Sequence, residues 1–437
     1  MVAAVFRYAQ IIRDAGVQDY VFEEMRTAGR LHFDYMDKED PVDYVVNIAK
    51  YLQLFDTPDK LKEIIKHQHV VEELDKPRTQ EMLDLVSQPE GSLIIIRSKS
   101  FEATGECTQE DTYFGTKYVK QPYSESLLEK MKAPTKLVPE GVKLGLPPVN
   151  NLLPKNLGLV PADPEHAQKP VLVKEYPGDS EVWYMKDDKF ERPKAIINVK
   201  VYPSAGLLSE LGVTAEGRMI TEVWIAAIKE YLREFKYMAE MANLELDFTI
   251  SNDAISLQFS GFNDSLAEFT QQTLTRIRDF RTLAKEDMAA IFSQVKEKLM
   301  QDWYNFYFDQ SYRQAGATFE TVVLAPGFEK RQLRASLEPF TFDDFYALVG
   351  GKDHWLVSGR CIWFLLGNLT KDTALNIAEK GRNALYGGRT EGIAVPKEAL
   401  PDIRSVALPN GAWYRLEKPL EDKENENSCL ISYFEAG

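Results

Sequence analysis

The stretch Trp183–Val201, WYMKDDKFERPKAIINVKV, decides the fold of the second half of the chain. Apolar residues open it, and the β-branched run from Ala195 to its end is typical of a buried strand. The four residues from Lys186 to Lys189 are charged, as expected of a turn at the surface. The stretch therefore predicts two strands joined by a charged, turn-rich connection.

Strand and helix patterns continue on both sides of this stretch. Alternating apolar and polar residues around Asn252-Asp253, in LELDFTIS and AISLQFSG, predict a β-hairpin. Helical spacing of apolar residues predicts long helices before and after that hairpin. A layer of helices against one antiparallel-rich sheet is an α+β domain. The expected strands are Val171–Glu175, Glu181–Lys186, Lys194–Tyr202 and Ile362–Gly367, and the expected helices are Thr214–Met241, Ser265–Phe280, a segment from Lys285 and Thr370–Leu385.

The first ~130 residues have mostly helical patterns, within the accuracy of such boundaries. Val5, Tyr8, Ile11 and Ile12 share one helical face, and Pro41–Phe55 repeats this pattern. Thr57-Pro58 is typical of a helix N-cap followed by proline in the first turn. The apolar run Ser92–Arg97, SLIIIR, predicts a strand in a core.

A proline-rich segment, Ala133–Pro170, separates the two halves of the chain. Its eight prolines fix their own φ angles and lack backbone donors, so they disfavour helices and interior strands. We call this segment the connector and interpret it as an extended linker between domains.

Composition limits the classes of function. A chain of 437 residues is expected to form two or more domains. The net charge of −15 disfavours nucleic acid as a partner, because phosphate binding needs a basic surface. No apolar segment has the ~20 residues of a membrane span. Three widely separated cysteines form neither a disulfide framework nor a metal motif, which indicates a reducing compartment, and we expect a cytoplasmic protein.

Several segments resemble the insulysin/pitrilysin (insulinase) family of zinc metallopeptidases. The pattern Trp-x-x-x-Asp-Asp-Lys-Phe-x-x-Pro-Lys, from Trp183 to Lys194, resembles the start of that family's third module, and RSKSFEATGECTQEDTYFGTKY resembles a loop of its second module. The other resemblances follow in the family's order along the whole chain. They are Ala239–Leu244, Gly261–Asp264, Leu366–Lys371 and Trp413–Phe434.

The resemblance implies repeated modules of helices packed on a mainly antiparallel sheet, joined by an extended linker. Residues 1–132 would be the C-terminal part of the second module and 133–170 the linker. Residues 171–395 would be the third module, and 396–437 a connection with the first strand of the fourth. Met1 would then begin inside a helix, and CLISYF near Gly437 would be a strand that pairs with later strands.

The zinc site of the family, an inverted His-x-x-Glu-His, does not occur in the sequence. The run from His67 to Glu73, HQHVVEE, places a histidine three residues before Glu72, but no second histidine follows, and we interpret these as surface histidines of an ordinary helix. His32, His166 and His354 are isolated in the sequence. We therefore expect no catalytic or metal-binding residue and no cofactor in this chain, and zinc in an N-terminal module outside this sequence.

Two functions remain open. The chain is either the non-catalytic central part of an insulysin-like zinc metalloendopeptidase, forming its chamber wall and hinge, or a stand-alone, non-enzymatic interaction protein derived from the family. In the first case its partners are a complementing chain and peptide substrates, and it is inactive alone. The resemblance also places a basic residue of the chamber wall at Lys143.

Overall fold

The computed structural model describes residues 2–55, 57–133, 144–177, 180–205, 213–350, 358–387 and 404–434. Its contacts divide the chain into two compact units, Met1–Asn151 and Leu152–Gly437, which we call unit 1 and unit 2. The division falls inside the connector, between Asn151 and Leu152.

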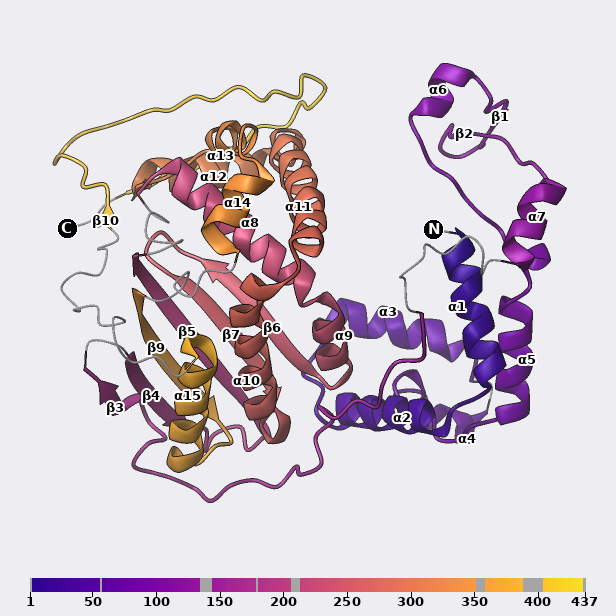
Figure 1. Cartoon of the computed structure of the whole chain (residues 1–437), viewed down its shortest axis with the longest axis horizontal. Helices are drawn as coiled ribbons and strands as arrows, with labels where there is room; N and C mark the ends of the chain where they lie inside the picture. Colours follow the sequence, from indigo (N-terminus) through magenta and orange to yellow (C-terminus); the bar gives the residue numbers. More distant parts are fainter. Residues whose placement is uncertain are drawn as a thin grey trace. The chain divides into compact units, whose positions relative to one another are not determined.

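Unit 1 is mostly helical, as its sequence predicts (Figure 1). The helices are α1 (Val2–Ala15), α2 (Asp19–Asp34), α3 (Pro41–Leu52), α4 (Pro58–Leu61), α5 (Lys76–Val86), α6 (Ser100–Thr104) and α7 (Glu125–Lys132), with short 3-10 turns at Lys66–Gln68 and Pro89–Gly91. Four of these helices, α3, α4, α5 and α7, have a side-chain N-cap of the ordinary kind. The side chain of Thr57 accepts from the backbone N–H of Lys60, and Asp75 accepts from Arg78 in the same way.

The prediction of a strand at Ser92–Arg97 is wrong. No residue of this run lies in a strand, and Leu93, Ile95 and Ile96 are 76%, 67% and 70% exposed. A strand needs neighbouring strands to pair its backbone, but the described part of unit 1 offers only the two-residue strands β1 (Gln109–Glu110) and β2 (Lys117–Tyr118), which pair with each other. An apolar run alone therefore did not specify the sheet that would bury it.

Unit 2 is built on a six-stranded sheet of order β3-β4-β9-β5-β7-β6. The β4–β9 pair is parallel, and the other four pairs are antiparallel. Every strand predicted for this sheet is present. The bounds are β3 (Val171–Tyr176), β4 (Ser180–Lys186), β5 (Lys194–Ala205), β6 (Leu244–Ile250), β7 (Ile255–Phe262) and β9 (Ser358–Gly367).

The stretch Trp183–Val201 forms the end of β4 and most of β5, as predicted, but these two strands are not neighbours. β9 lies between them, parallel to β4 and antiparallel to β5. A strand that comes more than 150 residues later in the chain thus enters the middle of the sheet. The charged connection after β4 passes over the end of β9 instead of making a hairpin.

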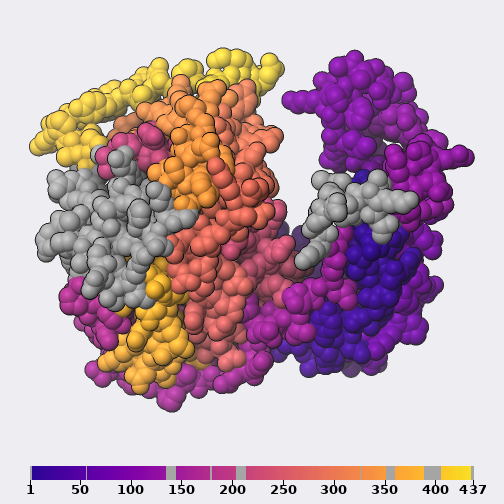
Figure 2. All heavy atoms as spheres, viewed as in Figure 1, coloured from indigo at the N-terminus to yellow at the C-terminus, as the bar shows by residue number. Residues whose placement is uncertain are grey.

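Helices cover one face of this sheet (Figure 1). The predicted helix Thr214–Met241 is divided at Leu232 into α8 (Ala215–Tyr231) and α9 (Arg233–Met241). α10 (Asn263–Asp279) and α15 (Lys371–Tyr386) pack on the same face, where Gly381 of α15 adjoins the ring of Trp363 and Leu274 of α10. Figure 2 shows the molecule from the side of these helices, with side chains of α10 and α11 (Lys285–Asn305) at the surface.

Short helices and turns complete unit 2. α8 packs on α11 and on α13 (Lys330–Leu337), and β8 (Leu324–Ala325) pairs with β10 (Arg404–Ser405). The run CLISYF does not form the predicted strand: Leu430 and Phe434 are 88% and 86% exposed, and residues 406–434 contain no strand. The remaining elements are α12 (Ser311–Val323), α14 (Phe342–Val349) and the 3-10 turns Phe280–Thr282 and Phe306–Phe308.

The core of unit 2 lies between the sheet and its helices. Alternate strand residues such as Val182, Tyr184, Ile197, Phe259 and Trp363 are fully buried beneath α8, α10 and α15. Because successive side chains of a strand point to opposite faces, the residues between them point to the other face of the sheet. We call that other face the open face.

Candidate functional site

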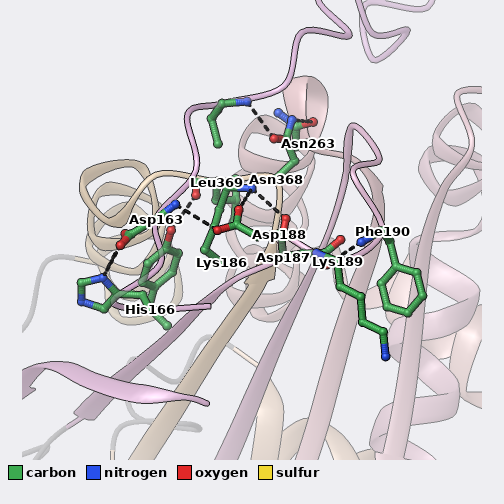
Figure 3. A network of polar contacts seen from close by, with 12 residues as sticks. Asp163, His166, Lys186, Asp187, Asp188, Lys189, Phe190, Asn263, Asn368 and Leu369 are labelled. Carbon is green, nitrogen blue, oxygen red and sulfur yellow. Dashed lines mark hydrogen bonds and ion pairs between the residues drawn. The ribbon is translucent and has the colours of Figure 1, made fainter. Parts of the chain in front are cut away.

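Three of the segments that carry the family resemblance, Trp183–Lys194, Gly261–Asp264 and Leu366–Lys371, converge at one end of the sheet of unit 2. β4, β7 and β9 all end there, and β5 begins there. The loop after β4, the turn at Asn263-Asp264 and the junction at Asn368-Leu369 meet connector residues 155–166 at this end (Figure 3). We call this group of contacts the connector clamp.

Two side chains hold connector residues 155–160. A carboxylate oxygen of Asp264 accepts from the backbone N–H groups of Lys155 and Asn156, at 2.8 and 3.0 Å. The amide of Asn368 accepts from the N–H of Val160 at 2.8 Å and donates to the carbonyl of Gly158 at 3.0 Å. An amide that both donates and accepts suits a segment of backbone that has no strand neighbour.

Asn368 is itself held from the sheet. Its Nδ2 donates to Oδ1 of Asn263 at 3.1 Å, and its backbone N–H donates to the carbonyl of Lys194 at 2.9 Å. The side chain is therefore buried, with 1% of its surface exposed. Asn368 begins an Asn-x-Thr pattern, but both protons of its amide nitrogen already have acceptors inside the fold.

The second part of the connector is held by the loop after β4. Oδ2 of Asp188 accepts from the N–H of Asp163 at 3.0 Å, while Oδ1 forms an ion pair with Lys186 at 3.0 Å (Figure 3). These bonds favour the ionised carboxylate. The hydrogen bond from Lys186, and then the one from Asp163, lower the pKa of Asp188 below its usual range. Asp187 shapes the loop itself, since its side chain accepts from the N–H groups of Lys189 and Phe190.

His166 is the last connector residue of the connector clamp. Its Nδ1 lies 2.9 Å from the carboxylate of Asp163, and its carbonyl accepts from the N–H of Lys186. Its ring packs on the ring of Tyr184, with 5.5 Å between centroids, and Tyr184 donates to the carbonyl of Leu369 at 2.7 Å. Burial, followed by the charges of Asp163 and Asp188, raises the pKa of Tyr184 to about 12, so this phenol stays a neutral donor.

His166, which is isolated in the sequence, therefore has close partners in the fold. Asp163 stands three residues earlier, and that spacing was the available signal, but sequence alone did not show that the connector folds back on β4. His32 is not isolated either: its ring lies 5.0 Å from that of His69. His354 lies outside the described residues.

The run HQHVVEE does not lie on an ordinary helix, contrary to prediction. It occupies a 3-10 turn and the extended residues that follow. His69 packs against His32, and burial followed by that neighbour lowers its pKa. Glu72 instead binds Lys66 and Arg30, and these hydrogen bonds lower its pKa to about 2. Glu72 is thus paired with two cationic side chains of the chain.

The connector clamp holds the connector in place. Its carboxylates, amides and phenol form hydrogen bonds with one another and with backbone groups, and none of these groups is an activated nucleophile. In the described part of the chain, no group of three or more histidine, cysteine, aspartate or glutamate residues is arranged to hold a metal ion. No described helix is both long and apolar enough for a membrane span. Lys143 lies outside the described residues.

Comparison with known proteins agrees with these motifs. Residues 33–336 match the family model described as the middle or third domain of peptidase M16. This match covers well over half of the chain, so the chain belongs to the M16 peptidase family, the insulysin/pitrilysin family. The predicted resemblance and the α+β fold of helices on a mainly antiparallel sheet are confirmed.

Individual relatives match nearly the whole chain. Human insulin-degrading enzyme is 26% identical over 431 residues, which are 98% of this chain and 39% of that protein. The peroxisomal insulin-degrading enzyme-like 1 of Arabidopsis thaliana is 24% identical, over 99% of this chain and 42% of its own length. The crystal structure of pitrilysin has the same fold, with a TM-score of 0.61 at 18% identity over 88% of this chain and 38% of pitrilysin. The chain thus spans about two fifths of the length of these relatives.

Proposed function

We propose that this chain is the non-catalytic central part of an insulysin-like zinc metalloendopeptidase, in which it forms chamber wall and hinge. The observation that carries the proposal is the match of the family's middle-domain model, together with the match of 98% of the chain to 39% of the length of human insulin-degrading enzyme. The connector clamp supports the hinge role, because it fastens one end of the connector to a rigid sheet. Zinc would reside in an N-terminal module with His-x-x-Glu-His, the substrates would be peptides, and the protein would work in the cytoplasm.

Complementation tests this proposal. The purified chain is mixed with a polypeptide that carries the His-x-x-Glu-His half of human insulin-degrading enzyme, and hydrolysis of a fluorogenic peptide is followed. We expect no hydrolysis by the chain alone and chelator-sensitive hydrolysis by the mixture. The matched control is the same half with its motif glutamate changed to glutamine, which removes the general base. Stoichiometric zinc and chelator-sensitive hydrolysis with the chain alone would overturn the proposal.

The alternative, a stand-alone interaction protein, has one observation in its favour. Unit 1 exposes the apolar run Leu93–Ile96 and the aromatic pair Tyr113 and Phe114, which are 88% and 89% exposed. Asp111 holds this pair in a tight turn by accepting from both of their N–H groups. Exposed apolar surface of this kind marks interaction sites. Light scattering on the chain, alone and mixed with the His-x-x-Glu-His half, distinguishes the two functions. A monodisperse monomer that does not bind this half favours the interaction protein, and formation of a complex with it favours the peptidase.

A further inference from the structure

The open face of the sheet in unit 2 carries a continuous row of side chains across five strands. The strand register places Trp183, Phe364, Asn198, Gln258 and Asp247 side by side in this order. Neighbouring strands lie about 4.8 Å apart, so the row is about 19 Å long. The helices α8, α10 and α15 occupy the opposite face.

The open face has an apolar half and a polar half. The apolar half lies on β4, β9 and the start of β5, and Ile196 within it is 38% exposed. The polar half lies on β7 and β6, and all of its β6 residues are exposed. The apolar half consists of Trp183, Met185, Ile196, Ile362, Phe364 and Leu366, and the polar half of Glu245, Asp247, Thr249, Ser256, Gln258 and Ser260.

The apolar half is held in place from within the sheet. The indole nitrogen of Trp183 donates to Glu181 at 2.9 Å, and Glu181 forms a buried ion pair with Arg360. The indole is thus oriented before any ligand arrives, which reduces the entropy that binding must overcome.

The polar half, in contrast, has groups without partners inside the described chain. The side-chain amides of Asn198 and Gln258 form no hydrogen bond with any described residue, although they are neighbours on adjacent strands. Glu245 and Asp247 form no ion pair within 4 Å with a described lysine or arginine, although Asp247 lies close enough to Lys229 of α8 to interact with its charge. On the same face Lys200 is paired with Asp253, so a charge here finds a partner where one is within reach.

We propose that the open face binds an extended polypeptide segment, with apolar side chains over Trp183 and Phe364 and a basic side chain beside Asp247. The two amides between these ends offer donors and acceptors to the peptide groups of such a segment. The exposed carboxylates of β6 supply the charge complementarity that selects a basic residue. This inference rests on the proposed function and specifies its substrate class: apolar segments that adjoin a lysine or arginine.

Binding to the chain alone, without zinc or a catalytic half, tests this inference separately from the complementation assay. The probe is a fluorescein-labelled nine-residue peptide of alternating leucine and serine with a terminal arginine, and a second peptide carries glutamate instead. Fluorescence anisotropy gives both dissociation constants. We expect tighter binding of the arginine peptide, and a smaller difference in high salt because the charges are exposed.

Two variants locate the contacts. Asp247→Lys is expected to weaken the arginine peptide about two- to fivefold, as for one exposed ion pair, and to strengthen the glutamate peptide. Ile196→Lys is expected to weaken both peptides, because it places a charge in the apolar half. The matched controls are Glu297→Lys and Val322→Lys, which make a corresponding charge reversal and a corresponding apolar-to-lysine change at exposed positions of α11 and α12. Thermal unfolding verifies each fold, and Ile196→Thr replaces Ile196→Lys if the lysine variant does not fold.

Three results would overturn the inference. The first is equal affinity of the wild-type chain for the two peptides. The second is an effect of Glu297→Lys as large as that of Asp247→Lys. The third is unchanged binding in a folded Ile196 variant.

Discussion

Removal of the Asn368 side chain is expected to loosen the connector from unit 2. Asn368→Ala deletes three hydrogen bonds, to the carbonyl of Gly158, to the side chain of Asn263 and from the N–H of Val160. At about 1 kcal/mol each, these bonds account for about 3 kcal/mol of the free energy of unfolding of unit 2. This figure is an upper value, because Asn368 is 1% exposed but Gly158 is exposed and Val160 is half-buried, so water can satisfy their backbone groups in the variant.

Urea unfolding followed by tryptophan fluorescence measures this loss. The matched control is Asn252→Ala, which deletes a single exposed hydrogen bond to the carbonyl of Pro326 and is expected to cost less than about 1 kcal/mol. Limited proteolysis is the second readout. In the wild type we expect the first cuts between Ala133 and Pro170, on the N-terminal side of the clamped residues 155–166, and in Asn368→Ala also within them, since released backbone is cut more readily.

The reasoning is refuted if Asn368→Ala unfolds within about 0.5 kcal/mol of the wild type, or costs no more than Asn252→Ala. First cuts inside Thr214–Leu244 would contradict the predicted domain division as well.

Two further predictions concern backbone strain and pH. Gly367→Ala is expected to destabilise the chain by about 3 kcal/mol, because the φ of Gly367 is +130° and a Cβ would lie 2.5 Å from the carbonyl oxygen of Lys194. The control Gly316→Ala, in α12 with open space around its Cβ, is expected to stabilise the chain by about 0.5–1 kcal/mol. Equal effects of the two substitutions in thermal unfolding would refute the strain argument. The pKa of Glu72 is about 2 in the folded chain against 4.5 ordinarily, so its contribution to stability is present above pH 4.5 and is lost as the pH falls through 2. Glu72→Gln should flatten this acid limb of the unit 1 stability profile, and an unchanged limb would show that the ion pairs with Arg30 and Lys66 contribute nothing.

Much of unit 2 could be predicted from local sequence patterns. The hairpin around Asn252-Asp253 and the strands that flank Lys186–Lys189 form as predicted, because alternation and turn chemistry act between residues close in sequence. The helix expected over Thr214–Met241 is also present, divided only at Leu232. Family motifs added the module type, which periodicity alone does not specify.

The apolar runs at Ser92–Arg97 and CLISYF show the limit of such patterns. Each has the composition of a strand, but a strand exists only where another strand accepts its hydrogen bonds. In unit 1 and in residues 406–434 the described chain provides no such neighbour, and both runs remain exposed.

The sequence by itself determined the six strands of the sheet and the main helices of unit 2, and the motifs around Asp187-Asp188, Asn263 and Asn368. Only the tertiary structure decided that β9 separates β4 from β5, because contacts between segments more than 150 residues apart leave no local periodicity. That insertion brings Asn368 beside the start of β5 and so creates the connector clamp. It also places Phe364 between Trp183 and Asn198, and thereby joins residues from separate strands into the single row of the open face.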